Sequence, residues 1–464
     1  MTASGTRPLL DLRSPVSVHV VGIGGAGMSA IATVLSAMGH AVTGSDLKDS
    51  PVLDRLRDSG LAVFVGHRPA NLGDPDVVTV SSAVDDTNPE VVEARRRGIP
   101  VLARAETLAA IAALRRCVAV AGTHGKTTTA SMLALLLVEA GLRPSFIIGG
   151  DVNEIGTNAV WDDGEWLVVE ADESDGSFLW LAPEIAVVTN VEADHLDHYG
   201  SFEAVRAAFE SFVSGATLHR VMGGDDPESA AIGRRTGADT VGTGASCTRR
   251  MVAIEPARSA VAFDLLDDTG ARLGHLAVPV PGLHNARNAA VAAVAGMAAG
   301  VPFEAAARAL ARFAGVARRF EFRGSAAGVT FVDDYAHLPT EVAAALAAAK
   351  DGGWDRVVAV FQPHRYSRTA ALWEEFGGAF ADADVVVVTD VYGAGEAPVP
   401  GVSGRKVAEA IRQAAPDRPV HYVPGRPELR GVVASLLRPG DLCCTLGAGD
   451  LTSLPDELLA DPGW

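Results

Sequence analysis

The sequence predicts an α/β fold of about three domains, and three observations support that prediction. The chain has 464 residues, which is too long for a single hydrophobic core. From Val16 onward, short runs rich in β-branched residues alternate with alanine- and leucine-rich stretches, a pattern typical of parallel sheets with crossover helices. Glycine turns follow two of the apolar runs, at Gly22 and at Gly122, and each turn precedes a helix-like stretch.

Changes in this pattern place domain boundaries near residues 113 and 318. The first domain, residues 1–113, has strand-like runs at 16–21, 41–43, 62–65 and 77–80 and ends in a helix-like stretch at 105–114. The second, residues 114–318, has strands at 166–170 and 185–189, a region of antiparallel strands and turns at 218–280, and helices at 285–300 and 303–313. The third, residues 319–464, has strands at 328–332, 356–361, 384–389, 419–423 and 441–446, which indicates another doubly wound domain.

The composition argues against several classes of partner. The formal net charge is −18, whereas nucleic acids and anionic membranes require a basic face, so we expect small-molecule partners. No apolar run approaches the roughly 18 residues of a membrane span, which predicts no membrane insertion and a cytoplasmic protein. The four cysteines have neither zinc-site nor disulfide spacing. We expect a monomer or a homodimer.

Residues 122–129 read GTHGKTTT, directly after the apolar run 117–121 and before the helix-like stretch 130–140. A strand, a glycine turn and a helix start leave backbone N–H groups facing an anion, while Lys126 adds a positive charge and Thr127 a hydroxyl for magnesium. The motif therefore indicates ATP and Mg²⁺, although Val120 stands where the common nucleotide loop has its first glycine. A chance G-K-T string is the alternative, which the strand, loop and helix in register disfavour.

A second glycine turn, VGIGGAG, lies in the first domain. Gly22, Gly24 and Gly27 form G-x-G-x-x-G between a strand and a helix, and Asp46 ends the next strand. This resembles a dinucleotide fingerprint, in which the glycines admit a diphosphate and the acid accepts a hydrogen bond from a hydroxyl. The alternatives are NAD binding and glycines that only pack a helix against a strand. Two serines after the fourth strand stand at the edge where such sheets bind ligands: Ser81 and Ser82.

Acidic side chains follow two strands of the second domain. The strand at 166–170 ends in EADESD, so Glu170 is placed to hold the magnesium that bridges nucleotide phosphates. The strand at 185–189 delivers six further polar groups to the same edge, Asn190, Glu192, Asp194, His195, Asp197 and His198. A solvated acidic loop is the plain alternative. Zinc at the two histidines is another, but no third histidine or cysteine follows at ligand spacing.

Other polar motifs stand before helices and at the second boundary. Asn285 and Asn288 lie three apart on one helical face, and their amides suit an adenine edge, although the stretch is equally a plain N-cap. Arg318 and Arg319, near the boundary, are placed to reach phosphates, and a solvated pair of exposed arginines is the plain alternative. In the third domain, Arg365 and Arg368 follow a strand and precede a helix, where guanidinium groups can bind the carboxylate of an amino acid.

Ten motifs, taken in order, make the chain similar to the bacterial Mur ligases. They are GIGGAGMS, GTHGKTTT, EADESDGSFL, VVTNVEADHLDHY, GLHNARN, GVARRF, DDYAHLPTE, FQPHRYSRT, DVYGAGE and LGAGD. The similarity runs from about Val18 to Asp450, and GIGGAGM with FQPHRYSRT resembles the members that join L-alanine to UDP-N-acetylmuramate. The resemblance implies a UDP sugar, not NAD, in a Rossmann-like first domain. It implies ATP and Mg²⁺ in a central P-loop domain with added antiparallel strands, and the amino acid in a Rossmann-like third domain.

The resemblance also implies roles for individual residues. For the sugar nucleotide they are Gly22, Gly24, Gly25, Gly27, Asp46, Ser81 and Ser82, with Asn158, Asp172, Glu173 and Ser174 near the acyl group. For ATP they are Gly122, Thr123, His124, Gly125, Lys126, Thr127, Thr128, Asn285, Asn288 and Arg319. The implied magnesium ligands are Thr127 and Glu170 for one ion and His195 for a second. The implied catalytic set is Lys126, His195, Arg319, His337, His364, Arg365 and Arg368. The chain departs from the family at Ala336 and Leu338, where a glycine and a second histidine are usual.

The implied reaction is ATP-dependent amide formation through an acyl phosphate, in the synthesis of peptidoglycan precursors. A recycling ligase, which attaches a preformed peptide to the same sugar nucleotide, is the near alternative, and its arginine motif would differ. An NAD-dependent oxidoreductase would leave GTHGKTTT unexplained. A non-catalytic nucleotide-gated binding protein need not retain Glu170, His195, Arg365 and Arg368 together.

Overall fold

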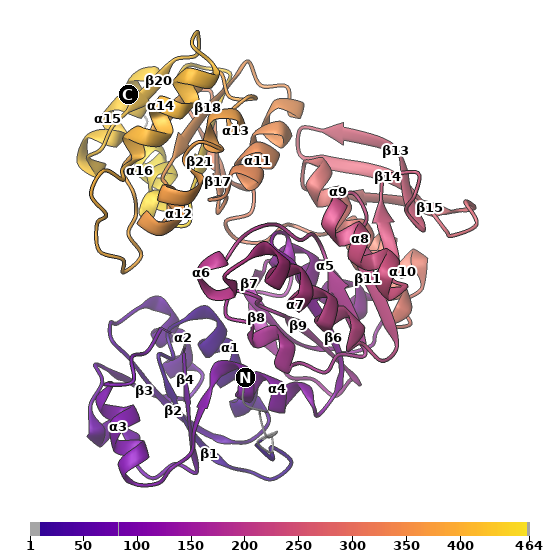
Figure 1. The fold of residues 1–464 in the computed structure, drawn as a ribbon, viewed down its shortest axis with the longest axis vertical. Helices are drawn as coiled ribbons and strands as arrows, with labels where there is room; N and C mark the ends of the chain where they lie inside the picture. The colour runs from indigo at the N-terminus through magenta and orange to yellow at the C-terminus, as the bar shows by residue number, and fades with distance from the viewer. Residues whose placement is uncertain (1–9, 82, 462–464) are drawn as a thin grey trace. The chain divides into compact units, whose positions relative to one another are not determined.

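The computed structural model describes residues 10–81 and 83–461, and it confirms the predicted α/β class. The chain forms three sheets flanked by helices (Figure 1). These elements group into two compact units. The first unit runs to Val252 and includes Leu265–Gly274 and Asn288–Leu310, and the second comprises Ala253–Asp264, His275–Arg287 and the chain from Ala311 onward.

The first unit opens with a five-stranded parallel sheet. Its elements are β1 (Ser17–Val21), α1 (Ala26–Ala37), β2 (Ala41–Asp46), α2 (Pro51–Asp58), β3 (Ala62–Val65), η1 (Pro69–Leu72), β4 (Val77–Val80), α3 (Pro89–Arg96), β5 (Val101–Ala103) and α4 (Arg104–Ala112). The strands are all parallel and lie in the order β3-β2-β1-β4-β5. The chain adds β2 and β3 on one side of β1 and then β4 and β5 on the other, so the switch point lies between β1 and β4. Both faces are buried, as parallel sheets require, because Val20 packs in the core with Ile31 and Ile111 while Val21 packs with Ala94. Ligands of such sheets bind beside the switch point.

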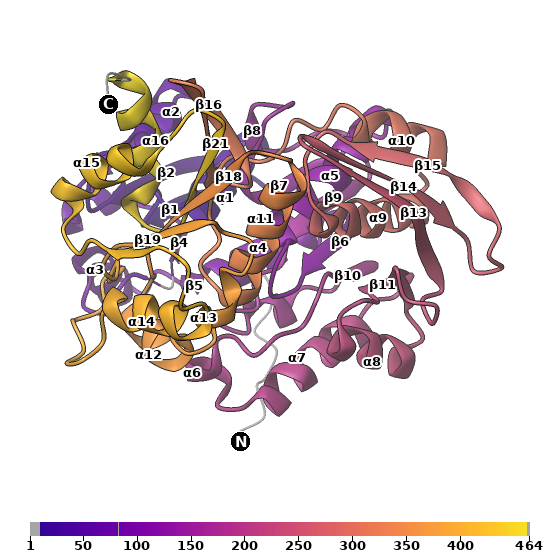
Figure 2. The same cartoon turned by 90° about the horizontal axis from the view of Figure 1, so that it is seen from above.

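The second sheet has ten strands in the order β15-β14-β13-β12-β11-β10-β6-β9-β7-β8. The elements are β6 (Arg116–Ala121), α5 (Lys126–Glu139), β7 (Ser145–Val152), β8 (Thr157–Val160), β9 (Trp166–Glu170), η2 (Ser177–Trp180), β10 (Ile185–Val188), α6 (Leu196–Tyr199), α7 (Phe202–Ser214), β11 (His219–Gly223), α8 (Pro227–Thr236), β12 (Asp239–Gly242), β13 (Arg249–Ala257), β14 (Ala260–Leu266), β15 (Arg272–Val278), α9 (Leu283–Ala298) and α10 (Phe303–Leu310). Taken in sheet order from β7 to β13, each neighbouring pair of strands is parallel. The edge strand β8 pairs antiparallel with β7. Figure 2 shows β13, β14 and β15 running side by side.

The expected run of antiparallel strands and turns at 218–280 is wrong in its first part. Residues Pro227–Thr236 form helix α8, and β11 and β12 on either side of it pair in parallel. The helix has ordinary start and stop signals: Asp226 caps it by accepting the N–H of Ser229 at 2.7 Å, and Gly237 ends it with φ +66°. The sequence analysis missed these signals because the helix is short and mostly polar.

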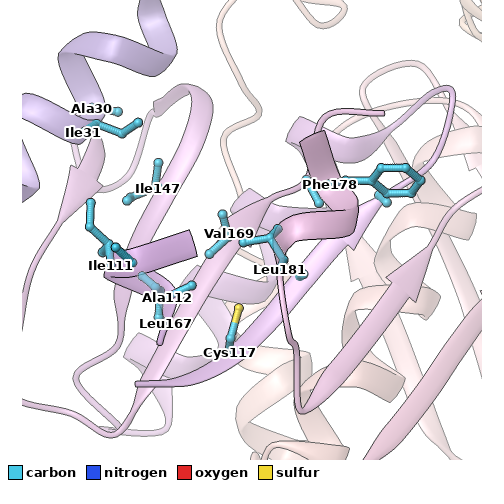
Figure 3. Packing of buried hydrophobic residues seen from close by; sticks show 14 of the residues in the cluster. Ala30, Ile31, Ile111, Ala112, Cys117, Ile147, Leu167, Val169, Phe178 and Leu181 are labelled. Carbon is cyan, nitrogen blue, oxygen red and sulfur yellow. The ribbon is translucent and has the colours of Figure 1, made fainter. Parts of the chain in front are cut away.

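One hydrophobic core joins the first two sheets. Ile31 of α1 and Ile111 of α4 belong to the same buried cluster as Ile147 of β7, Leu167 of β9 and Phe178 of η2. Figure 3 shows Ile31, Ile111, Ile147 and Leu167 near one another, and Phe178 on η2 beyond Val169 and Leu181. Because apolar burial stabilises by about 25 cal/mol per Å², a shared core of this extent fixes the two sheets with respect to each other.

The second unit contains a six-stranded sheet in the order β16-β17-β21-β18-β19-β20. Its elements are β16 (Glu321–Ala326), β17 (Val329–Asp334), α11 (Pro339–Asp351), β18 (Arg356–Phe361), α12 (Tyr366–Leu372), α13 (Phe376–Ala379), β19 (Val385–Val388), α14 (Gly404–Ala414), β20 (Val420–Tyr422), α15 (Arg426–Leu436), β21 (Asp441–Leu446), η3 (Asp450–Ser453) and α16 (Leu454–Ala460). Only the edge strand β16 is antiparallel to its neighbour. Phe361 packs in the cluster that includes α11 and α14, and Val360 packs in the cluster on the opposite face with α15 and α16.

Two smaller expectations concern membrane spans and cysteines. Within residues 10–81 and 83–461, the model contains no helix with the length and apolar character needed to cross a membrane. All four cysteines are buried free thiols, and burial raises the pKa of Cys117 and of Cys443 to about 12. These thiols are therefore protonated packing groups.

A fully buried carboxylate, Glu90 of α3, organises one end of the first sheet. Its side chain is 0 % exposed. It accepts hydrogen bonds from the hydroxyl of Ser45, from the N–H of Arg68 at 3.0 Å and from Nδ2 of Asn71 at 2.7 Å, and Nε2 of His19 lies at 3.5 Å. Burial raises the pKa of Glu90, but these hydrogen bonds outweigh burial and lower the pKa to about 2.

Replacing this carboxylate tests the packing of the first sheet. The pKa of Glu90 is about 2 against an ordinary 4.5, so its charge contributes about 3 kcal/mol to folding above pH 5 and loses that contribution as the pH falls through 2. We expect Glu90→Gln to speed hydrogen exchange of amides in β1 and β4 at pH 7, and the difference from the parent to shrink towards pH 3. Asp86→Asn, an exposed change on the same domain, is the control. Equal exchange in Glu90→Gln and the parent at pH 7 would contradict this account.

Candidate active site

The loop after β6 has the geometry of a phosphate loop. Gly122 has φ +131° and Gly125 has φ +77°, and Gly125 is the N-cap of α5. A Cβ at Gly125 would lie 2.5 Å from Oδ1 of Asn288, and a Cβ at Gly122 would collide with Thr189. Both positions therefore require glycine. The turn places the N-terminus of α5, with Lys126, Thr127 and Thr128 in its first turn, at the loop.

The end of strand β10 holds this loop in place. Asn190 accepts the N–H of His124 at 2.8 Å through Oδ1 and donates from Nδ2 to the carbonyl of His124 at 3.0 Å. The N–H of Thr123 donates to the carbonyl of Asn190 at 3.1 Å, and the hydroxyl of Thr189 donates to the carbonyl of His124. The ring of His124 is paired with Glu192 at 3.1 Å. Asn190, noted in the sequence only as one of a polar cluster, thus fixes the backbone that would surround a phosphate.

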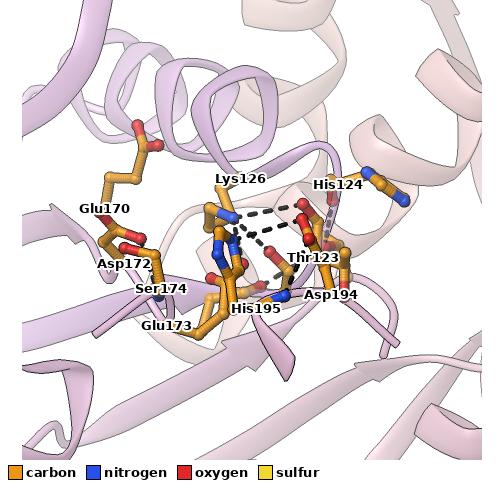
Figure 4. Close-up of polar contacts among 12 residues, drawn as sticks. Thr123, His124, Lys126, Glu170, Asp172, Glu173, Ser174, Asp194 and His195 are labelled. Carbon is orange, nitrogen blue, oxygen red and sulfur yellow. Dashed lines mark hydrogen bonds and ion pairs between the residues drawn. The ribbon is translucent and has the colours of Figure 1, made fainter. Parts of the chain in front are cut away.

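Lys126 points back onto the loop and towards the acids after β9. Its Nζ donates to the carbonyl of Gly122 at 2.7 Å and to Oε1 of Glu173 at 2.8 Å (Figure 4). Burial lowers the pKa of Lys126, but Glu173, Asp172 and Glu170 outweigh it, so the pKa rises and the ammonium stays charged. Burial raises the pKa of Glu173 despite its lysine partner, and its Oε2 has no hydrogen-bond partner among the described residues. The pair is thus a buried ammonium held by a carboxylate whose burial is only partly compensated. An anionic ligand could replace that carboxylate as the partner of Lys126.

Thr127 and Glu170 form a pair of hard oxygen donors beside the loop. The hydroxyl of Thr127 donates to Oε1 of Glu170 at 3.0 Å, and Oε2 of Glu170 accepts the N–H of Gly149 at 2.7 Å. Hydroxyl and carboxylate oxygens are the protein ligands that Mg²⁺ prefers, and it takes its other ligands from phosphates and water. Among residues 10–81 and 83–461, no three His, Cys, Asp or Glu side chains form a metal cluster by themselves. The donor set therefore suits a nucleotide-bound magnesium.

His195 stands at the start of the short helix α6 with φ +54°. Its ring Nε2 lies 3.3 Å from Oδ2 of Asp194. Its backbone N–H donates to the other carboxylate oxygen of Asp194, Oδ1, at 2.8 Å. Figure 4 shows His195 in the group of side chains that also contains Lys126 and Glu173. Its assignment as a ligand of a second magnesium stays a prediction.

The glycine turn of the first domain is also tightly built. The N–H of Gly24 donates to Oδ2 of Asp46 at 2.8 Å, and a Cβ at Gly24 would lie 2.9 Å from that oxygen. Gly22 has φ +80° and lies against Ser81, which places the ends of β1 and β4 together at the switch point. Asp46 thus already uses one oxygen to shape the loop, and its contact with a ribose or another hydroxyl stays a prediction. Ser82 lies outside the described residues.

Two side chains fasten this turn to the second sheet. Nδ2 of Asn158, on β8, donates to the carbonyl of Ala26 at 3.4 Å and to the carbonyl of Ile148 at 3.2 Å. Nη2 of Arg104, the first residue of α4, donates to Oδ2 of Asp172 at 3.1 Å, and its guanidinium lies over Gly27. Sequence reasoning missed Arg104, because an arginine at a helix start carries no motif of its own. The other oxygen of Asp172 accepts the N–H of Ser174.

The two asparagines assigned to adenine have different surroundings. Asn288 belongs to the first unit and its amide lies against Gly125 of the phosphate loop. Asn285 belongs to the second unit, where Nδ2 donates to the carbonyl of Pro281 at 2.7 Å. Both are buried, which agrees with a specific role for each amide more than with a solvated cap. Their contact with adenine stays a prediction.

Two arginines at the start of the second unit are held differently. Arg318 has φ +61°, donates to the carbonyl of Gly447 at 2.8 Å and lies 3.4 Å from Oδ2 of Asp333. Arg319 lies over the ring of Tyr335 and 4.0 Å from Oε1 of Glu341. The guanidinium of Arg319 is therefore the less tightly held of the two, which suits its predicted contact with a phosphate.

The histidines and arginines of the third sheet gather at the ends of β17 and β18. The rings of His337 and His364 are 5.8 Å apart, and Nδ1 of His364 lies 3.1 Å from Nη1 of Arg368. Burial, then His337 and the arginines, lowers the pKa of His364 to about 4, and burial also lowers the pKa of His337. Both imidazoles are therefore neutral at pH 7. Arg365, with φ +67°, is exposed at the start of α12.

Tyr392 lies in the DVYGAGE motif, but sequence reasoning gave it no role of its own. Its ring stacks on His364 at 5.8 Å with an interplanar angle of 12°, and its carbonyl accepts the N–H of Arg365 at 2.8 Å. Only a motif-level similarity marked this tyrosine, since a lone aromatic after a strand is usually part of the core. The structure instead places it beside the candidate amino-acid contacts.

Family models match most of the chain. The model for the Mur ligase family catalytic domain matches residues 17–116, that for the middle domain 120–296, and that for the glutamate ligase domain 318–449. A protein of Rubrobacter xylanophilus named UDP-N-acetylmuramate–L-alanine ligase is 48% identical over 455 residues, which cover 96% of this chain and 100% of that protein. One of the same name from Kineococcus radiotolerans is 50% identical over 95% of each chain.

Solved structures give the same result. A UDP-N-acetylmuramate-alanine ligase from Thermotoga maritima has a TM-score of 0.82 and 30% identity, covering 96% of this chain and 98% of that one. A murein peptide ligase from Psychrobacter arcticus has a TM-score of 0.69 and 25% identity, covering 97% and 99%. With a phosphate loop backed by paired acids, and with matches that span all three sheets, the chain belongs to the Mur ligase family.

Proposed function

We propose that this chain joins L-alanine to the lactyl carboxylate of UDP-N-acetylmuramate, with conversion of ATP to ADP and phosphate, in the synthesis of peptidoglycan precursors. The observation that carries the proposal is near-full-length identity of 48% to 50% with ligases named for this reaction. The phosphate loop and its acids supply the ATP chemistry that the reaction needs. Because its substrates include ATP and a nucleotide sugar, we place the reaction in the cytoplasm, and we expect a monomer or homodimer.

The proposed reaction has two steps. The lactyl carboxylate attacks the γ-phosphorus of ATP, which forms an acyl phosphate and releases ADP. The amine of L-alanine then attacks the acyl carbon, and the amide forms as inorganic phosphate and a proton leave. Both steps need anionic groups to approach each other, so the protein must offset charge and keep water from the acyl phosphate.

The first step falls to the phosphate loop. The ammonium of Lys126 would leave the carbonyl of Gly122 and bind the β- and γ-phosphates, which offsets charge on the transferring group. Arg319 supplies a second cation. Thr127 and Glu170 would hold the magnesium, which, when bound, neutralises phosphate charge and orients the γ-phosphate. The glycine turn at Gly22–Gly27 would hold the diphosphate of the sugar nucleotide.

The second step falls to the third domain. Arg365 and Arg368 are placed to bind the carboxylate of L-alanine, since guanidinium groups pair with carboxylates in a fork geometry. His337 and His364 are neutral at pH 7 because their pKa values are lowered by burial, so neither repels the ammonium of the incoming amino acid. Leu338, in place of the family's usual second histidine, is buried and precedes α11 as its N-cap residue.

The near alternative is that the chain is a recycling ligase. The similarity to the murein peptide ligase of Psychrobacter arcticus is the observation that favours this alternative. That likeness is weaker, at 25% identity against 48%. The NAD-dependent oxidoreductase is not favoured, because the glycine turn that suggested it belongs to a Mur ligase domain.

The amino-acid substrate is the first point to test. We expect phosphate release from ATP and magnesium to require UDP-N-acetylmuramate and to be fastest with L-alanine, compared with glycine, L-serine and the L-alanyl-D-glutamyl-diaminopimelate tripeptide. The measurement is a coupled phosphate assay with each acceptor supplied separately. Release only with the tripeptide would assign the recycling reaction instead, and release without any sugar nucleotide would contradict both.

Lys126 should be required for the first step. We expect Lys126→Met to lower phosphate release at least about 100-fold, because the phosphoryl group would lose its buried cation. Lys350→Met is the control, since Lys350 is 55% exposed and makes only a long contact of 3.7 Å with Asp384. Activity of Lys126→Met within threefold of the parent would remove the lysine from the proposed mechanism.

Glu170 should set the magnesium requirement. We expect Glu170→Gln to raise the magnesium concentration needed for half-maximal phosphate release about tenfold or more, because an anionic ligand becomes neutral. Glu165→Gln, an exposed change just before the same strand end, is the control. An unchanged magnesium dependence in Glu170→Gln would place the metal elsewhere.

A further inference from the structure

Arg104 lies where the first domain meets the acids of the second sheet. It is the first residue of α4, and its Nη2 lies 3.1 Å from Oδ2 of Asp172. Its side chain passes over Gly27, where a Cβ would lie 3.0 Å from Nη1. Gly27 thus leaves room for the arginine to cross the start of α1. Both partners belong to the first compact unit, so this contact lies between packed elements of one unit.

Asp172 stands between two cations. Nη2 of Arg104 lies 3.1 Å from Oδ2 of Asp172, and Glu173, the next residue in the chain, lies 2.8 Å from Nζ of Lys126. Arg104, Glu170 and Asp172 also line one small cavity, together with the apolar side chains of Leu108 and Phe178. The arginine and the acids therefore face the same small, partly open cavity.

Lys126 lies beside a segment that carries three acids. Glu173 touches Lys126 at 2.8 Å, and Asp172 and Glu170 lie in the same short segment at the end of β9. In this half-buried setting, unit charges a few ångströms apart attract strongly. Without Arg104, the charge of Asp172 would act on Lys126 alone and draw the ammonium further from the phosphates that it must bind.

We propose that Arg104 is a positioning residue that pairs with Asp172 and thereby leaves Lys126 available to the phosphates of ATP. This role rests on the proposed function, because it requires that Lys126 bind nucleotide phosphates. Arg104 acts through Asp172 and not by touching the nucleotide. It also connects the sugar-nucleotide turn at Gly27 with the acids at the ATP loop, so the two substrate sites share one set of charges.

A double-mutant cycle tests the role. The readout is the affinity of the full-length protein for the magnesium complex of AMP-PNP, measured by calorimetry, with circular dichroism as the check of folding. We expect Arg104→Ala to weaken binding about tenfold, a typical coupling between neighbouring charges, and Arg104→Lys to stay within about threefold of the parent. In the Asp172→Asn background, Arg104→Ala should have no further effect, because the charge that Arg104 neutralises is gone.

The matched control is Arg55→Ala. Arg55 of α2 pairs with Asp151 of β7 at 3.2 Å, so it also joins the first domain to the second sheet, but its side chain is 65% exposed. We expect it to bind the nucleotide like the parent. Unchanged binding in Arg104→Ala, or an equal loss in the Asp172→Asn background, overturns the role of Arg104. Failure of the parent to release phosphate with UDP-N-acetylmuramate and L-alanine would instead overturn the proposed function, and the binding cycle would still be readable.

Discussion

The shared core between α1, α4 and the strands β7 and β9 is the constraint on which the first unit depends. It brings Ile31 and Ile111 against Ile147 and Leu167, and so fixes the glycine turn of the first sheet relative to the phosphate loop of the second. The polar contacts of Arg104 and Asn158 lie at the edge of this core. They would be worth little in water, but packing has already ordered both partners, so the entropy cost of each contact is small. Two candidate substrate sites on one packed body need little reorganisation to act together.

The two candidate sites differ in their electrostatics, which suits their separate predicted tasks. Around the phosphate loop, three carboxylates face one lysine, an arrangement that favours divalent metal together with a polyanion over either alone. Around the third sheet, His337 and His364 are neutral, and the nearby charges include Arg368, 3.1 Å from His364, and Glu341, 3.2 Å from Nδ1 of His337. That arrangement favours a carboxylate without repelling an amine. Each candidate site thus has charges that a ligand of the proposed kind would complement.

Much of the fold and of the site could be predicted from the sequence, and the failures have physical causes. The β-branched runs located the buried strands, because a parallel sheet buries both faces and leaves an unbroken apolar signal. Helix α8 was missed because it is short and mostly polar, although Asp226 and Gly237 cap it. Strands β7 and β8 were missed because their glycines and polar residues weaken the strand pattern. At the site, GTHGKTTT marked the loop, but nothing local marked Thr189 or Arg104, whose partners lie 65 and 68 residues away. Such contacts exist only once the sheets have assembled.

The two glycine turns show why a motif predicts geometry better than it predicts a ligand. In the first domain, Asp46 accepts the N–H of Gly24, so the acid that would read a ribose in a dinucleotide enzyme first stabilises the turn itself. In the second sheet, the carbonyls of Gly122 and Thr123 accept from Lys126, which a phosphate must draw away. Both turns provide a close approach to the backbone, and either could admit several anions. The two turns differ in the charges around them. Acids suited to magnesium lie beside the phosphate loop, and Arg104, already held by Asp172, lies beside the glycine turn of the first domain. The identity of the ligand is therefore decided by residues that lie outside the motif.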